Sequence, residues 1–299
     1  MQALVGELTR YAGADANVLI AGETGAGKDM VARALHMSGP RRSEPFVQID
    51  CPSLPATLLE SELFGHEPGA FTDATTARPG RFEVAGRGSV YLDRVNELPL
   101  EIQPKLLRLV EEKRGERLGG TVAFEVYARV IASTDTGIEE RVRSGSFRRD
   151  LYHRLNVLPL VVPPLRSRRS DILPLARTFL REAAGRLNRP TPVLTGRAAA
   201  ALQAHAWPGN VRELRHILER AILSTDGDRI DVEDLPLEVL DPQAYLGPGQ
   251  ASRPTLEGIE RQYVELVLRE ARGHQTRAAA VLGISRKALW EKRKRYGLD

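Results

Sequence analysis

Two hydrophobic patterns divide the chain. Before about residue 170, short apolar runs alternate with helical stretches and glycine-rich turns, which is typical of parallel strands joined by crossover helices. From about Ser170 onward the apolar spacing becomes wholly helical. The predicted fold class is therefore α/β, with a parallel-sheet core followed by all-helical segments. The predicted strands are Val18–Ala21, Phe46–Ile49, Ser89–Leu92, Val130–Ala132 and Val157–Val162, and the predicted helices between them include Asp29–His36 and Ile102–Glu112.

The helical pattern is clearest after the turn Trp207-Pro208-Gly209, where Asn210 is predicted to cap a helix. Thr195 is predicted to cap an alanine-rich helix before it. A stretch holding Gly247-Pro248-Gly249 predicts a linker, and a last helical unit follows it. One stripe of the first of these helices is apolar and comprises Val211, Leu214, Ile217, Leu218, Ala221 and Ile222.

Composition excludes several classes of protein. The 299 residues are 42% hydrophobic and 27% charged, which provides enough apolar surface for a globular fold. The longest apolar stretch, Val157–Leu165, contains three prolines and falls short of the roughly 18 residues that a membrane span needs. We find no secretory leader, and a single cysteine, Cys51, fits a reducing compartment. We therefore expect a cytoplasmic protein.

The formal charge of +4 is unevenly distributed. Residues 272–298 contain eight basic side chains and one acidic side chain, so the rest of the chain is slightly acidic. A basic segment at one end predicts nucleic-acid binding there.

A glycine-rich loop follows the first predicted strand and precedes a helix. Its glycines let backbone amides turn toward phosphate oxygens, while the helix N-terminus and Lys28 add positive charge. Asp29 stands where most P-loop proteins have a serine or threonine that binds magnesium, which excludes most P-loop kinases and G proteins. The candidate nucleotide-binding residues are Gly22, Glu23, Thr24, Gly25, Ala26, Gly27, Lys28 and Asp29.

Together with this loop, further blocks resemble the NtrC-like bacterial enhancer-binding proteins, AAA+ ATPases that remodel sigma-54 RNA polymerase. The resemblance covers essentially the whole chain in the right order. Besides the loop, it is carried by Glu62-Leu63-Phe64-Gly65-His66-Glu67, Gly69-Ala70-Phe71-Thr72, Leu92-Asp93, Phe147-Arg148-Arg149-Asp150-Leu151, Arg154-Leu155-Asn156-Val157, Pro163-Pro164-Leu165-Arg166 and Trp207-Pro208-Gly209-Asn210-Val211-Arg212-Glu213-Leu214.

The resemblance implies a domain order, cofactors and partners. It implies an AAA+ ATP-binding core over residues 1–170, a helical lid over 171–240, a linker over 241–254 and a Fis-type helix-turn-helix over 255–299. ATP and Mg²⁺ are the implied cofactors. The implied partners are sigma-54 RNA polymerase, upstream enhancer DNA and further copies of the chain, as a dimer and as a hexameric ring when engaged. Family members have a segment before the first helix, so the N-terminus is expected to be truncated.

The implied catalytic machinery departs from the family pattern at its centre. Asp93 matches the second nucleotide motif and is the implied magnesium ligand and catalytic residue. The family's catalytic glutamate follows it, but here the next residue is Arg94, which cannot accept a proton. Glu97 is a poor substitute because its position has no catalytic role in the family.

Other implied nucleotide contacts are arginines. Arg148 and Arg154 match the arginine fingers that reach a neighbouring subunit's γ-phosphate, and Arg212 matches the lid arginine that senses nucleotide within its own subunit. Asp135 stands where asparagine is usual, and Asp50 replaces the asparagine that switches the catalytic glutamate. Both aspartates are expected to weaken ATP binding unless magnesium or protonation offsets their charge.

The loop that contacts sigma-54 in the family reads GAFTGA. Here Gly69, Ala70, Phe71 and Thr72 are kept as candidate contact residues, but the second glycine has become Asp73. This change puts a charge on the contact loop, so we expect weaker engagement of sigma-54.

The C-terminal unit resembles a Fis-type helix-turn-helix, with Gly283 in the turn. Leu282, Ile284 and Leu289 are predicted to pack its two helices together, and a preceding helix, Leu256–Arg269, carries a stripe (Ile259, Tyr263, Leu266, Val267) suited to dimer formation. The candidate DNA-binding residues are Ser285, Arg286, Lys287, Lys292, Arg293, Lys294 and Arg295, with Glu291 a less favoured reader of the major groove.

Three functions remain open at this level. The favoured one is a DNA-binding, ATP-binding regulator that interacts with sigma-54 but whose hydrolysis and remodelling are impaired by Arg94 and Asp73. The second is a fully active, ATP-hydrolysing sigma-54 activator. The third is a P-loop enzyme acting on a small molecule, which nothing beyond the loop supports.

Overall fold

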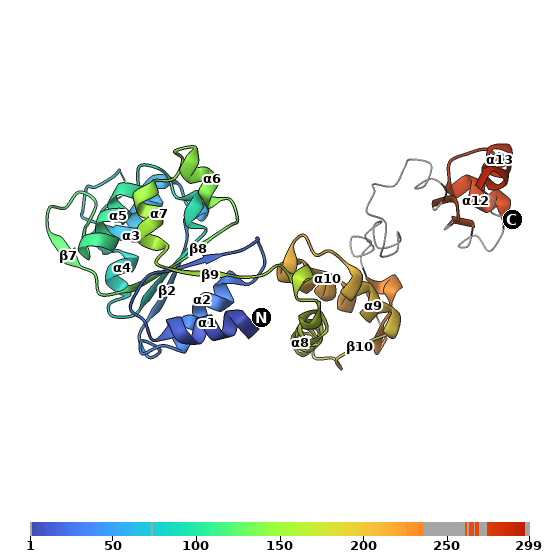
Figure 1. Ribbon diagram of the computed structural model, residues 1–299, viewed down its shortest axis with the longest axis horizontal. Helices are drawn as coiled ribbons and strands as arrows, with labels where there is room; N and C mark the ends of the chain where they lie inside the picture. Colours follow the sequence, from blue (N-terminus) through green and yellow to red (C-terminus); the bar gives the residue numbers. More distant parts are fainter. Residues whose placement is uncertain are drawn as a thin grey trace. The chain divides into compact units, whose positions relative to one another are not determined.

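The computed structural model describes residues 2–72, 74–225, 227–235, 261, 263–265, 267, 268 and 274–296 (Figure 1). The chain forms two compact units, Met1–Asp241 and Pro242–Asp299. The predicted linker and residue Asp73 lie outside the described residues. None of the described helices combines the length and apolar character that crossing a bilayer requires.

A five-stranded parallel sheet forms the centre of the first unit, in the order β2-β5-β8-β1-β9. The five strands predicted from the sequence are confirmed, with ends that shift by one or two residues. The strands are β1 (Val18–Ala21), β2 (Phe46–Asp50), β5 (Ser89–Asp93), β8 (Arg129–Thr134) and β9 (Leu158–Val161).

Helices cover both faces of the sheet. Successive strand residues point to opposite faces, and the apolar side chains on each face are buried beneath these helices. Val18 and Ile20 pack with α1 (Gln2–Ala12) and α2 (Lys28–Met37), while Leu19 belongs to the core on the other face. That other face is covered by α3 (Ala56–Phe64), α5 (Gln103–Glu112) and α7 (Arg149–Leu155), as Figure 1 shows. The shorter helices of this region are α4 (Arg81–Val84) and α6 (Ile138–Arg143), with 3₁₀ turns at Cys51–Ser53 and Val95–Glu97.

The carboxyl ends of the central strands place polar side chains along one edge of the sheet. Asp50 and Asp93 end neighbouring strands and are paired in register. Thr134 ends β8, and the glycine-rich loop leaves β1 at the same edge. Ligands of open α/β sheets bind at this edge, so the topology gathers the candidate nucleotide-binding residues there.

Two short antiparallel pairs project from the core. One joins β3 (Gly65–His66) to β4 (Arg78–Pro79), and the other joins β6 (Arg114–Glu116) to β7 (Ala123–Glu125). The sequence pattern did not predict either pair, because strands of two or three residues are too short for a hydrophobic period.

A helical subdomain follows the sheet and has its own core. It contains α8 (Ile172–Arg186), α9 (Gly196–Ala204) and α10 (Asn210–Ser224), and its buried cluster runs from Leu165 to Leu235. The expectation of wholly helical structure is wrong in one detail, since β10 (Val193–Leu194) pairs in parallel with β11 (Arg229–Ile230). Further 3₁₀ turns lie at Leu165–Ser167, Arg169–Asp171 and Val232–Asp234.

The helix caps in this subdomain follow one prediction and contradict another. The Thr195 hydroxyl accepts a hydrogen bond from the Ala198 amide, as expected of an N-cap. The prediction that Asn210 caps α10 is wrong, because Gly209 occupies the N-cap position and the Asn210 side chain bonds to the P-loop and to the Leu165 amide instead. The Glu213 carboxylate accepts from the Gly209 amide at 2.7 Å in its place.

The second unit contains a helix-turn-helix. Its helices are α12 (Gln275–Val281) and α13 (Arg286–Tyr296), with Gly283 at a φ of +65° in the turn. The Ser285 hydroxyl accepts from the Ala288 amide at 3.1 Å and caps α13 as predicted. Leu289 is buried, with Leu282 and Ile284 packed against it.

The predicted dimer stripe is only partly described. Val267 is buried in the core of this unit with Val264, so it supports the helix-turn-helix and is not available to a partner chain. Tyr263 is exposed. Ile259 and Leu266 lie outside the described residues.

Trp207 is the largest fully buried side chain of the helical subdomain. Its indole N–H donates to the Leu202 carbonyl at 2.9 Å, and its ring packs edge-on against His205. We expect Trp207→Ala to lower the free energy of unfolding by about 3–5 kcal/mol, because a large cavity would remain. Urea denaturation measures this. Leu223→Ala, at an exposed position of α10, should stay within about 0.5 kcal/mol of wild type, and equal losses in both variants would contradict the expectation.

Candidate nucleotide site

The glycines of the P-loop are required for two different reasons. Gly25 has a φ of +75°, and a Cβ there would lie 2.3 Å from the Gly209 carbonyl oxygen of the helical subdomain. Gly27 has a φ of +97° with open space where its Cβ would be. The loop therefore packs tightly against the subdomain at one glycine and leaves an open cradle at the other, which fits a bound phosphate chain.

Lys28 begins α2 and is only 8% exposed. Its ammonium donates to the carbonyl oxygens of Gly22 at 2.7 Å and Glu23 at 3.2 Å. Burial lowers the pKa of Lys28, while the charges of Asp93 and Asp135 oppose that shift. The amine is thus held within the loop by carbonyl groups, and anionic phosphate oxygens are stronger acceptors than these.

Asp93 is positioned by two hydroxyl groups. Its Oδ1 accepts from Ser133 at 2.5 Å and from Tyr91 at 3.0 Å. No three metal-binding side chains gather among the described residues. Mg²⁺ often takes one or two carboxylates together with water and phosphate oxygens, so Asp93 and the neighbouring P-loop fit this ion as part of a nucleotide complex.

Arg94 occupies the position after Asp93 in a left-handed backbone conformation, with φ 55° and ψ 51°. Its amide donates to the Ser133 hydroxyl at 2.9 Å. Its Nη2 donates to both carboxylate oxygens of Asp50, at 2.7 and 2.9 Å. Asp50 and Arg94, two of the residues at which this chain departs from the family pattern, are therefore direct partners.

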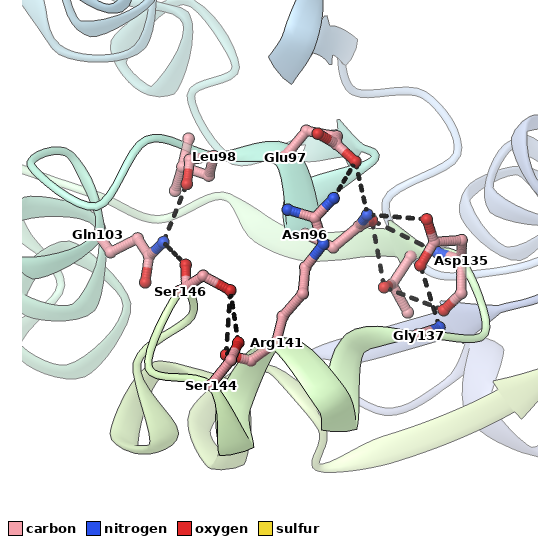
Figure 2. Close-up of polar contacts among 10 residues, drawn as sticks. Asn96, Glu97, Leu98, Gln103, Asp135, Gly137, Arg141, Ser144 and Ser146 are labelled. Atoms are coloured by element: carbon pink, nitrogen blue, oxygen red, sulfur yellow. Dashed lines mark hydrogen bonds and ion pairs between the residues drawn. The ribbon is translucent and has the colours of Figure 1, made fainter.

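A hydrogen-bonded network surrounds Asn96 (Figure 2). The Asn96 amide nitrogen donates to Asp135 at 3.0 Å, and its amide oxygen accepts from the Thr134 hydroxyl at 3.2 Å. Asp135 also accepts from the Gly137 amide. Glu97 forms an ion pair with Arg141 at 2.6 Å.

Two buried residues of this region were missed by reasoning from the sequence. Asn96 holds the Asp135 carboxylate, and Gln103 bridges α5 to the segment that carries Arg148. Gln103 donates to the Leu98 and Ser146 carbonyl groups, as drawn in Figure 2, and accepts from the Arg148 amide at 2.8 Å. Their amides matter through contacts distant in sequence, which no local motif signals.

Arg148 and Arg154 flank the exposed side of α7. The Arg148 guanidinium forms two hydrogen bonds with Asp150, at 2.7 and 3.1 Å. Arg154 donates to Glu111 at 3.0 Å. Both pairs are solvent-exposed and therefore contribute little to stability, so both arginines can exchange partners at low cost.

The helical subdomain is fastened to the P-loop itself. Arg166 forms an ion pair with Glu23, and Asn210 donates to Glu23 and to the Thr24 carbonyl, both at 3.1 Å. The Val211 amide donates to the Gly25 carbonyl at 2.9 Å, which places the neighbouring Arg212 beside the loop. Hydrogen bonds from Arg166 and Asn210 lower the pKa of Glu23 to about 2.

The candidate sigma-54 loop lies between β3 and β4. Gly69 has a φ of +82°, and the Phe71 ring packs edge-on against His66 with centroids 5.0 Å apart. Thr72 is exposed, and Ala70 lies against Gly119 of the second projecting pair. Arg117 bonds Glu67, which follows β3, and Glu83 of α4. Asp73 lies outside the described residues.

The predicted DNA-binding residues mostly lie on the solvent face of α13. Arg286, Lys287, Lys294 and Arg295 are exposed, while Lys292 and Arg293 are partly buried. Ser285 is used as the helix cap. Trp290 adds a residue that the sequence analysis did not single out; it is 56% exposed, with the Lys294 amine 5.4 Å from its ring centre.

A P-loop at the carboxyl edge of a parallel sheet, closed by a helical lid and joined to a helix-turn-helix, defines an AAA+ DNA-binding regulator. Comparisons with known proteins specify the class. The sigma-54 interaction domain matches residues 1–161, the AAA+ ATPase lid domain residues 166–251, and the Fis-family bacterial regulatory protein domain residues 255–296. The chain belongs to the NtrC-like sigma-54 enhancer-binding proteins.

Similar proteins include whole regulators that are longer than this chain. The regulatory protein AtoC of Escherichia coli is 42% identical over 98% of this chain and 65% of its own length. ZraR of Klebsiella oxytoca is 43% identical, covering 98% of this chain and 66% of ZraR. A crystal structure of NtrX from Brucella abortus in complex with ATP has a TM-score of 0.76 at 34% identity, covering 100% of this chain and 68% of NtrX. The chain thus spans about two thirds of these proteins.

The ion pair between Glu23 and Arg166 predicts a pH-dependent contribution to stability. Because the folded-state pKa of Glu23 is depressed, this contribution is present above its ordinary value of 4.5 and is lost as the pH falls toward about 2. We expect Arg166→Ala to lower the unfolding temperature at neutral pH, and the difference from wild type to shrink as the pH falls from about 4.5 to about 2. Arg215→Ala, which breaks an exposed pair within the lid, is the control. A difference that stays constant with pH would contradict the assignment.

Proposed function

We propose that the chain is an enhancer-binding regulator whose P-loop binds ATP with Mg²⁺ but hydrolyses it slowly. The observation that carries this proposal is the pairing of Arg94 with Asp50. A guanidinium stands where the family has its catalytic base, and arginine does not accept protons at accessible pH. Losing a catalytic base typically costs about 10²- to 10⁴-fold in rate.

The residues of the site have separate tasks in this proposal. Backbone amides of Gly25–Lys28 and the Lys28 ammonium bind phosphate oxygens, and Asp93 holds Mg²⁺, which would neutralise phosphate charge. Arg212 senses the nucleotide from the lid. Arg148 or Arg154 reaches the γ-phosphate of a neighbouring copy, so the complete site requires an oligomer, a ring of six when engaged.

Two surfaces account for the proposed partners: the loop that contains Phe71 and the exposed face of α13. Phe71 and Thr72 present an aromatic ring and a hydroxyl to sigma-54, with Gly69 and Ala70 shaping their loop. The basic face of α13 binds enhancer DNA, with Arg286 and Lys287 toward the bases and Lys294 and Arg295 toward phosphates. Partly impaired hydrolysis would make the chain a repressor, an antagonist or a passive subunit of mixed rings.

The test of the proposal is ATP turnover by the purified chain, which we expect to be barely above background. Arg94→Glu alone should recover little, because the new carboxylate would face the Asp50 carboxylate. The double variant Asp50→Asn/Arg94→Glu should raise the rate at least about tenfold, because it restores a base beside a neutral partner. Asp50→Asn alone is the matched control and should not gain activity.

The fully active alternative predicts a different outcome. Rapid turnover by the unmodified chain, abolished by Lys28→Ala, would show that hydrolysis does not need a base at position 94. No described feature favours a small-molecule P-loop enzyme over either of these two readings.

DNA binding by α13 has its own test. Lys294→Ala should weaken binding to all sequences and reduce the salt dependence of the association constant by about one counterion. Arg286→Ala should cost about 1–3 kcal/mol on the preferred site and relax its specificity. Fluorescence anisotropy over a salt series measures both. Arg177→Ala removes an equal charge from the lid surface and should leave DNA binding unchanged; equal effects of all three variants would contradict the assignment.

A further inference from the structure

Arg94 uses only part of its hydrogen-bonding capacity on Asp50. A guanidinium has five N–H donors. Both bonds to Asp50 come from Nη2, and neither Nε nor Nη1 donates to any atom of the described residues. The side chain remains 44% exposed. Three N–H groups are therefore available to another acceptor while the pair with Asp50 stays intact.

The position of this guanidinium is held from several sides. The Arg94 backbone is fixed by the bond from its amide to the Ser133 hydroxyl, which also donates to Asp93. Asp50 lies on the strand next to Asp93 and is paired with it in register. The anchored group therefore sits beside the magnesium-binding carboxylate of the same subunit.

Electrostatics connect Arg94 to the phosphate end of the P-loop. Burial lowers the pKa of Lys28 most, and the charges of Arg212 and, to the smallest extent, Arg94 lower it further. Arg94 also interacts with the charges of Asp50, Asp93 and Glu97. Arg94 directly follows Asp93, the last residue of β5, at the edge of the sheet from which the P-loop also leaves β1. Lys28 reaches the β- and γ-phosphates in P-loop proteins, so Arg94 lies at the same edge as the expected terminal phosphate.

We propose that Arg94, anchored on Asp50, binds the terminal phosphate of ATP within its own subunit. Arginine at position 94, in place of the family's glutamate, then has a function in binding: it makes the site select triphosphate over diphosphate and retain ATP. Asp50 acts as a positioning residue that holds the guanidinium in place. This inference rests on the proposed binding of ATP at the P-loop and adds the specificity of that site.

The test is isothermal titration calorimetry of the full chain with Mg²⁺ and either ADP or the non-hydrolysable β,γ-imido analogue of ATP. We expect Arg94→Ala to weaken the triphosphate about 10- to 100-fold, the size of a lost charge-assisted hydrogen bond, and to change ADP affinity by less than about twofold. Arg94→Lys should recover part of the loss, since it keeps the charge without the fork. Arg197→Ala, at another arginine paired with aspartate, is the matched control.

A second variant distinguishes two causes of weaker triphosphate binding: loss of the attraction between Arg94 and the phosphate, and repulsion of the phosphate by an Asp50 carboxylate that has lost its partner. In Asp50→Asn/Arg94→Ala the aspartate charge is also gone. If the triphosphate loss persists there, Arg94 itself binds the phosphate; if the double variant regains wild-type affinity, the inference is overturned. Equal weakening of both nucleotides by Arg94→Ala, or no weakening of either, also overturns it.

The same titrations distinguish this inference from the proposed function. Lys28→Ala should weaken both nucleotides, because it removes a contact that ADP and ATP share. If Lys28→Ala leaves both affinities unchanged, the P-loop does not bind nucleotide and the proposed function fails with the inference. If Lys28→Ala weakens both and Arg94→Ala affects neither selectively, only the inference fails.

Discussion

Negative charge at the carboxyl edge of the sheet is the constraint on which the site depends. Asp50 and Asp93 end adjacent strands, and Asp135 follows the next one, at the edge where a polyphosphate is expected to bind. Each carboxylate is met by a different donor: a guanidinium for Asp50, hydroxyl groups for Asp93, and amides for Asp135. An unpaired carboxylate there would repel phosphate in a region partly removed from water, where such repulsion is strong. Arg94 is thus part of the charge balance of the whole edge.

The lid contacts the same edge of the sheet through the backbone of the P-loop. The Val211 amide and the Asn210 side chain bond to loop carbonyl groups, and Gly25 leaves no space for a side chain between loop and lid. These contacts occupy the carbonyl oxygens of Thr24 and Gly25, two residues of the P-loop. The lid is therefore held directly against the loop that is proposed to bind phosphate.

The sequence predicts the fold well where periodicity is strong and the site only where a motif is local. The apolar run Val18–Ala21 predicts a strand, which the structure confirms with side chains packed on both faces of the sheet, and the P-loop is evident from its glycines. Asn210 was assigned to a cap because asparagine favours that position locally, but a P-loop carbonyl and the Leu165 amide compete for its side chain and prevail. Partners 45 or more positions away leave no local pattern.

In the proposed ring, the pairing of Arg94 with Asp50 would also change the charges that a neighbouring subunit meets. In a site with a glutamate base, an incoming arginine adds positive charge to a region that contains an extra carboxylate. Here a guanidinium is already present, and Asp50 neutralises it on one side only. An arginine such as Arg148 would have to leave Asp150 and approach another cation, with only the phosphate charge between them. Such an approach is favourable only when the full triphosphate is bound, because ADP carries less negative charge to offset the repulsion. In the proposed ring, contact between subunits would therefore depend on bound ATP more strongly than in a site built around a glutamate.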